Sequence, residues 1–162
     1  MAEKKLGSFE AQKLAMLSNG LIYQTYVSDH RLVAVKTGST MDGGRAWTMH
    51  FGLIGALIHY LLMRGVLKRR QALLSSNESL PLDELLHQDP KNFEIRFDGL
   101  ERAELKKAGI LKAGHAKLIL KKLGEEPIEL SLQTKQTLAQ ALPLLEAGLQ
   151  SRLEVESKLR PS

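Results

Sequence analysis

The chain has 162 residues, of which 43% are hydrophobic and 25% charged, a balance that indicates a folded globular protein and argues against intrinsic disorder. It contains no cysteine, which excludes disulfides and thiolate metal sites and favours a reducing, cytoplasmic compartment. Residues 43–77 hold five basic and no acidic side chains, and the remainder of the chain balances 18 against 18, so the net charge of +5 comes from this one segment.

The N-terminal quarter predicts a short helix followed by a β-hairpin. Residues 8–17 fit an amphipathic helix with Ser8 as its N-cap, and a Ser-Asn-Gly turn at 18–20 ends it. Two runs rich in β-branched and aromatic residues follow at 21–27 and 31–36. The three polar residues between them have the length of a hairpin turn. No apolar segment of signal-peptide length precedes these elements, so export is not expected.

The middle of the chain predicts a helical insert. Residues 37–45 form a glycine-rich linker that lacks the Gly-Lys-Ser/Thr ending of a phosphate-binding loop. Residues 47–63 are the most apolar stretch of the chain, and a basic cluster follows at 64–70. A second short helix is predicted at Pro81–His87, with Pro81 at its first position and two acidic residues in its first turn.

The C-terminal half changes to the two-residue period of β-strands. Three runs there alternate apolar with polar residues and each predicts a strand: residues 92–97, 115–122 and 128–132. Residues 100–107 offer another possible strand. A closing helix begins near Thr134, and Pro143 is expected to kink or split it. The tail at 149–162 is expected to fray or to extend this helix.

The predicted fold is α+β. A hairpin alone is marginally stable, so the early strands are expected to share one sheet with the later ones. We therefore expect one domain over residues 1–162, with a bent antiparallel sheet of about six strands, a C-terminal helix and a helical insertion at residues 46–90.

Two stretches of the chain match the patterns of a known family. Residues 26–35 (YVSDHRLVAV) and residues 92–101 (NFEIRFDGLE) resemble the V-T-D-x-R-L hairpin and the later F-x-I-P-Y-x-x-I strand of bacterial pleckstrin-homology-like (PH-like) domains. The resemblance covers about half of the chain and implies a bent antiparallel sheet closed at one end by a helix. It also implies binding of membranes or proteins without catalysis. The insertion departs from the family pattern, and no basic constellation matches a phosphoinositide site residue by residue.

The insert is the expected binding surface, and two interpretations of it remain open. Residues 47–63 would span only about 25 Å as a helix, short of the roughly 30 Å hydrocarbon core, and a crossing would separate the two halves of the sheet. A full membrane span is therefore not expected. The helix either packs in the core or at a homodimer seam, through the small residues Gly52, Gly55 and Ala56, or lies in a membrane interface.

The expected function is a non-catalytic binding or assembly module that acts by protein–protein contact or self-association through the insert. The alternative is peripheral binding to anionic lipid at the inner face of the membrane, where each basic side chain contributes about 1 kcal/mol. The candidate residues for the partner or lipid surface are Trp47, Tyr60, Arg64, Lys68, Arg69 and Arg70.

Other functions have weaker sequence support. The five histidines form no metal-binding motif and the chain lacks a Gly-x-Ser-x-Gly nucleophile elbow, so neither a metal, another cofactor nor enzymatic activity is expected. Nucleic-acid binding is the less favoured third option, because aromatic residues for base stacking make up only 5% of the chain. A second basic zone in the C-terminal half is its main support: Lys106, Lys107, Lys112, Lys117, Lys121 and Lys122.

Overall fold

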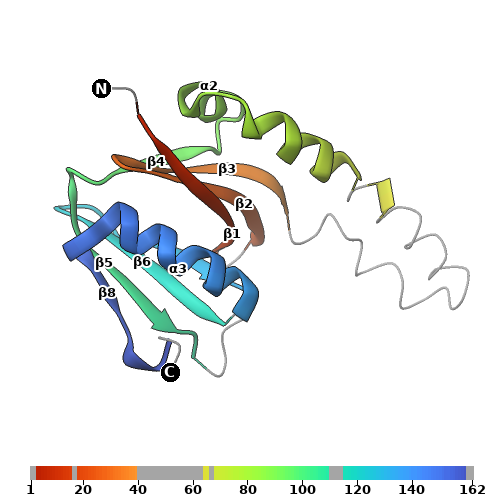
Figure 1. Cartoon of the computed structure of the whole chain (residues 1–162). Helices are drawn as coiled ribbons and strands as arrows, with labels where there is room; N and C mark the ends of the chain where they lie inside the picture. The colour runs from red at the N-terminus through yellow and green to blue at the C-terminus, as the bar shows by residue number, and fades with distance from the viewer. Residues whose placement is uncertain (1–2, 16–17, 40–63, 66–67, 110–114, 160–162) are drawn as a thin grey trace, which may run out of the picture.

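The structure is a computed structural model that describes residues 3–15, 18–39, 64–65, 68–109 and 115–159. The described strands form one mixed sheet of eight strands in the order β4-β3-β2-β1-β7-β6-β5-β8 (Figure 1). The strands are β1 (Lys5–Ala15), β2 (Ser18–Ser28), β3 (Arg31–Ser39), β4 (Phe93–Arg96), β5 (Leu100–Lys107), β6 (Ala116–Lys122), β7 (Ile128–Leu132) and β8 (Leu153–Val155). The named helices are α2 (Leu82–His87), α3 (Lys135–Leu149) and the short 3-10 turns η1 (Gln150–Arg152) and η2 (Ser157–Leu159).

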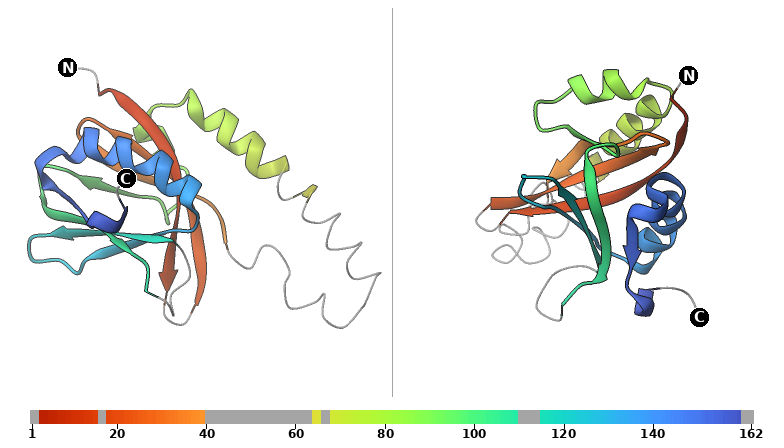
Figure 2. Two further views of the ribbon diagram at one scale, coloured as in Figure 1. Left: turned by 60° about the horizontal axis from the view of Figure 1, so that its bottom comes forward. Right: turned by 90° about the vertical axis from the view of Figure 1, so that its left-hand side faces the viewer.

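The sheet consists of two halves that meet at a narrow junction. β1 to β4 form one antiparallel half, and β5 to β7 form the other. The halves are joined where Gln12 of β1 pairs with Ser131 of β7. They run in clearly different directions, so the sheet is bent, and α3 lies against it (Figure 2).

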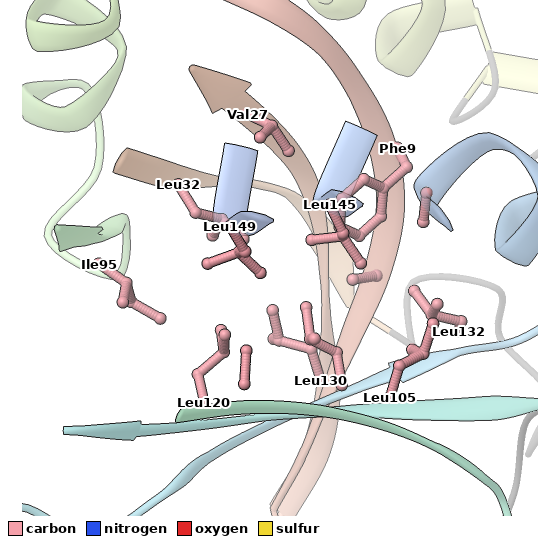
Figure 3. Close-up of a cluster of buried hydrophobic side chains, with 14 of the residues drawn as sticks. Phe9, Val27, Leu32, Ile95, Leu105, Leu120, Leu130, Leu132, Leu145 and Leu149 are labelled. Atoms are coloured by element: carbon pink, nitrogen blue, oxygen red, sulfur yellow. The ribbon is translucent and has the colours of Figure 1, made fainter. Parts of the chain in front are cut away.

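One cluster of buried apolar side chains fills the space between both halves and α3 (Figure 3). It confirms the prediction that the early hairpin and the later strands share one interior. The first half contributes Phe9, Val27, Leu32 and Ile95, the second half contributes Leu105, Leu120, Leu130 and Leu132, and α3 contributes Leu145 and Leu149.

Helix α3 begins where the sequence predicts and continues through its proline. The Thr134 hydroxyl caps the helix by accepting a hydrogen bond from the Thr137 backbone N–H at 3.0 Å. Of the two effects predicted for Pro143, a split of the helix is wrong, because α3 is one helix from Lys135 to Leu149, and a kink stays a prediction. Pro143 is exposed, so the backbone group that loses its donor lies toward water, where the loss is tolerated.

A glycine allows the end of α3 to approach the sheet closely. A Cβ on Gly148 would lie 2.9 Å from Val27 Cγ1 and 3.1 Å from Phe97 Cε2. A larger side chain at this position would therefore require Val27, Phe97 or α3 to shift.

Residues 8–15 do not form the predicted helix, and the turn predicted at 18–20 is the start of β2. The residues from 8 to 15 belong to β1, where Phe9 and Ala11 enter the core in the two-residue period of a strand. Pairing along β2 decides the conformation of a segment whose short apolar pattern fits either period.

The described part of the C-terminal tail is ordered and does not extend α3, because it consists of η1, β8 and η2. Gln150 has a φ of 51° and ends α3, after which β8 pairs in parallel with β5. Leu153 and Val155 pack against the main cluster and hold the strand in place. The α+β class is confirmed, whereas the sheet has eight strands rather than about six and is mixed rather than antiparallel.

The insert connects β3 to β4. The linker predicted at 37–45 is in part strand, since β3 extends to Ser39, and its remainder lies outside the described residues. The predicted short helix is confirmed as α2, with Pro81 as its N-cap rather than its first residue. A further helix occupies residues 68–78 and runs out beyond the sheet (Figures 1 and 2).

Candidate binding surface on the insert

Helix α2 covers the outer face of β2 and β3, opposite the main core. On β3 the side chains alternate, so that Leu32 enters the main core while Val33 and Val35 point outward. Leu82 and Leu85 of α2 are buried against this outer surface. Together with Tyr26 they form a second buried apolar cluster, separate from the main core. Burial of these apolar side chains anchors the C-terminal part of the insert.

Arg31 joins the insert to two other parts of the chain. Its guanidinium donates to Glu3 at 2.7 Å, to Asp83 of α2 at 2.6 Å and to Glu94 of β4 at 2.6 Å. The side chain is only 15% exposed. The hydrogen bond to Glu3 is the largest cause of a raised pKa for Arg31, and the bonds to Glu94 and Asp83 raise this pKa further. The same bond to Arg31 lowers the pKa of Glu3. One cation therefore fixes the N-terminus, α2 and β4 together.

Asn92 fastens the end of the insert to β3. Its side-chain oxygen accepts a hydrogen bond from the Lys36 backbone N–H at 2.8 Å, and its amide donates to the Leu85 carbonyl at 2.7 Å. The Lys36 ammonium also reaches Asp89 at 3.3 Å. These bonds satisfy backbone groups at the edge where α2 returns to the sheet.

Lys5 of β1 caps the helix at 68–78. Its ammonium donates to the backbone carbonyls of Glu78 at 3.1 Å and Leu80 at 3.4 Å, and it lies 4.5 Å from the centre of the Tyr26 ring. A cation at a helix C-terminus satisfies carbonyls that lack intrahelical donors. Burial lowers the pKa of Lys5. The capping contact positions the helix over the outer face of the first half-sheet.

The helix at 68–78 presents most of its surface to solvent. Asn77 is its one buried residue, and Arg70 and Leu74 are half-buried. Lys68 and Arg69 are exposed, and neither has an acidic partner within the part of the chain that the structure describes. Arg70, Leu74 and Asn77 are four and three positions apart, so they share one narrow face of the helix. This face is turned toward the sheet, and the other side chains point outward.

The six predicted surface residues fall into three groups. Trp47 and Tyr60 lie outside the described residues. Arg64, Lys68 and Arg69 are exposed. Arg70 instead turns toward the sheet and donates to Glu10 of β1 at 2.5 Å.

The second basic zone is largely neutralised by acidic neighbours. Glu104 of β5 is 3% exposed, accepts hydrogen bonds from Lys121 at 2.9 Å and from Lys106, and forms an ion pair with Arg102 at 3.1 Å. Hydrogen bonds from Lys106 and then Lys121 lower the pKa of this carboxyl to about 2. Lys117 pairs with Glu129 and Lys122 with Glu125, while Lys112 lies outside the described residues.

A polar groove near the end of α3 was not apparent in the sequence. Two adjoining hollows of about 210 and 230 Å³ share Asp29, Phe97 and Arg152 as lining residues. These residues come from the β2–β3 turn, the β4–β5 turn and η1, so no sequence motif connects them. The larger hollow also contains Arg96 and Asp98, and its two arginines and two aspartates favour neither sign of ligand charge.

Two further properties bear on the class of site. No group of three histidine, aspartate or glutamate side chains among the described residues is arranged to hold a metal ion. In the same part of the chain, no helix combines the length and the apolar character that crossing a membrane requires.

Comparisons with known proteins identify no family. No protein-family model matches the sequence, and no curated protein matches it. Among solved structures, the crystal structure of the C-terminal domain of an unknown protein from Leishmania infantum aligns over 91% of this chain and 86% of that chain, with 11% identity and a TM-score of 0.48. A similarity of this size carries no argument about fold or function.

Proposed function

We propose that the chain is a non-catalytic binding module in which a PH-like bent sheet displays the insert as its contact surface. The strand order supports the PH-like assignment: two antiparallel units, β1–β4 and β5–β7, meet at β1 and β7, and a C-terminal helix covers the shared core. The resemblance implies a bent antiparallel sheet closed at one end by a helix, and the bend and the position of α3 support it. β8 is then an addition at the edge of the sheet.

The exposure of the helix at 68–78 carries the proposal. This helix lies on the outer face, away from the main core, and directs Lys68 and Arg69 into solvent. In the sequence it follows the apolar run at 47–63, and Leu73 on the helix is itself 40% exposed. An insert that combines apolar and cationic residues provides the surface that association buries. We therefore propose a protein partner, or a second copy of the chain, as the ligand of the insert.

Peripheral binding to an anionic membrane is a second candidate, favoured by one observation. Lys68 and Arg69 lack acidic partners among the described residues, so they are available to lipid phosphates at the inner face of a cytoplasmic membrane. Nucleic acid has less support, because the ion pairs around Glu104 already engage much of the C-terminal basic zone.

Reversing two charges tests the proposal. We expect Lys68→Glu combined with Arg69→Glu to weaken self-association by up to about thirtyfold, since each exposed basic contact contributes up to about 1 kcal/mol. Light scattering over a range of protein concentrations measures this change. A control with Lys107→Glu and Lys135→Glu changes the net charge equally at exposed sites on β5 and α3, and it is expected to associate like the wild type.

The same variants separate the two candidates when vesicles are added. Pelleting with phosphatidylserine vesicles but not with phosphatidylcholine vesicles, lost in the insert variant alone, would favour the membrane. A wild-type chain that stays monomeric and pellets with neither vesicle contradicts self-association and membrane binding.

A further inference from the structure

We infer that the Arg70–Glu10 contact is an internal latch that competes with the partner, and that the partner is a protein surface bearing carboxylates. The inference rests on the proposed function, because it concerns the helix proposed there as the contact surface. It adds the chemical class of the partner and a mechanism that regulates access to the helix.

The helix at 68–78 is held to the sheet by polar contacts. None of its residues is among the side chains that pack in either described apolar cluster. Its buried residue is Asn77, whose side-chain nitrogen has no hydrogen-bond partner in the described part of the chain. An unsatisfied buried donor and little apolar burial are properties of segments that open at low free-energy cost.

The sheet surface beside the latch is polar as well. Glu10 is directly opposite Gln24 in the β1–β2 register, and the Gln24 amide donates to the Ser8 hydroxyl at 2.8 Å on the same face. Releasing Arg70 from Glu10 therefore exposes hydrophilic groups that water can solvate. Val35, which is opposite Gln24 on the same face, is buried in the cluster that contains Leu82 and Leu85 of α2.

The Arg70–Glu10 pair is accessible to a competitor. The two side chains are 21% and 41% exposed, and a partly exposed ion pair contributes roughly 0–1 kcal/mol. Lys68 and Arg69 precede Arg70 directly and meet no acidic side chain among the described residues. Of the three consecutive cations, only Arg70 is therefore paired with a carboxylate of the described chain, that of Glu10 on β1. A partner protein that offers several carboxylates would engage Lys68 and Arg69 on the outward surface and compete with Glu10 for Arg70.

The other end of the helix is anchored, which defines where it opens. Lys5 holds the carbonyls of Glu78 and Leu80, and Leu82 and Leu85 of α2 are buried against β2 and β3. The N-terminal end of this helix points away from the sheet (Figures 1 and 2). Opening therefore pivots near residues 79–80, releases Arg70 and leaves α2 in place.

Neutralising Glu10 tests the latch through binding. A peptide of glutamates serves as the probe for an acidic protein surface. We expect Glu10→Gln to bind this peptide about two- to fivefold more tightly than Glu101→Gln, which changes the net charge equally at an exposed position of β5. In an Arg70→Gln background the difference should vanish, because the double-mutant cycle isolates the pair.

Hydrogen exchange without any partner tests the latch separately. Glu10→Gln should speed amide exchange in the helix at 68–78 by about two- to fivefold and leave α2 unchanged, whereas Glu101→Gln should change neither. If the helix exchanges at the same rate in both variants, the latch is overturned whatever the probe does.

The remaining outcomes separate this inference from the proposed function. Faster exchange combined with binding to phosphatidylserine vesicles alone would overturn the acidic protein partner in favour of a membrane. Faster exchange with no binding to either probe would overturn an anionic partner altogether. In that case the light-scattering test still decides whether the insert mediates self-association.

Discussion

Replacing Arg31 with methionine is expected to destabilise the protein by about 2–3 kcal/mol. The substitution leaves Glu3, Asp83 and Glu94 close together without their shared cation. The loss of the compensating charge costs more than a surface ion pair is worth, because the Arg31 side chain is 15% exposed. Asp83 is 72% exposed and can turn to water, which keeps the expected cost below that of a fully buried pair.

Urea unfolding measures this cost, and Arg96→Met provides the matched control. Arg96 pairs with Arg31 across the β3–β4 register, but its side chain is 70% exposed and its contact with Asp98 is 3.6 Å long. We expect the control to change stability by less than about 0.5 kcal/mol. Amide exchange should also accelerate in α2 for Arg31→Met. An equal loss of unfolding free energy in the two variants would show that the contacts of Arg31 with Glu3, Asp83 and Glu94 do not hold the insert.

Acid should remove a stabilising contribution of about 2 kcal/mol that Glu104 makes at neutral pH. The pKa of this carboxyl is lowered from 4.5 to about 2 in the folded chain, so folding favours its charged form. The contribution is therefore complete above pH 4.5 and is lost as the pH falls through the range from 4.5 to 2. We give about 2 kcal/mol because the three basic partners of Glu104 are each about half exposed and solvent screens them.

Glu104→Gln isolates this contribution. At neutral pH the variant should be less stable than the wild type by about 2 kcal/mol, and the difference should shrink as the pH falls through the same range. Denaturant unfolding at a series of pH values measures it. Glu101→Gln on the same strand is exposed and should track the wild type. A difference that is independent of pH would rule out the ionised carboxylate as its source.

The sequence predicts well the elements whose own residues determine them. The runs that became β2 and β3 are dense in β-branched and aromatic residues, and Thr134 is a suitable N-cap for α3. β1 was missed because its sequence, KLGSFEAQKLA, has weak β propensity and is a strand through its pairing with β2. β8 has only three residues, and its parallel partner β5 lies about fifty residues earlier in the chain.

The candidate surface is predictable to the same extent. The exposure of Lys68 and Arg69 follows from their charge, since solvated cations rarely enter a core. The contact of Arg70 with the sheet does not follow from the sequence. Its partner Glu10 is 60 positions away, on a strand where the sequence predicts a helix. The neutralisation of the second basic zone likewise depends on which carboxylates the β5–β6 register brings beside each lysine.

Hydrogen exchange compared between dilute and concentrated protein tests the central claim most directly, because it locates the contact surface without a named ligand. We predict slower amide exchange at residues 68–78 in the concentrated sample, with the Lys68→Glu, Arg69→Glu variant showing no such change. Protection that appears instead along β5 and β8, or around the groove lined by Asp29 and Arg152, would contradict the assignment of the insert as the contact surface.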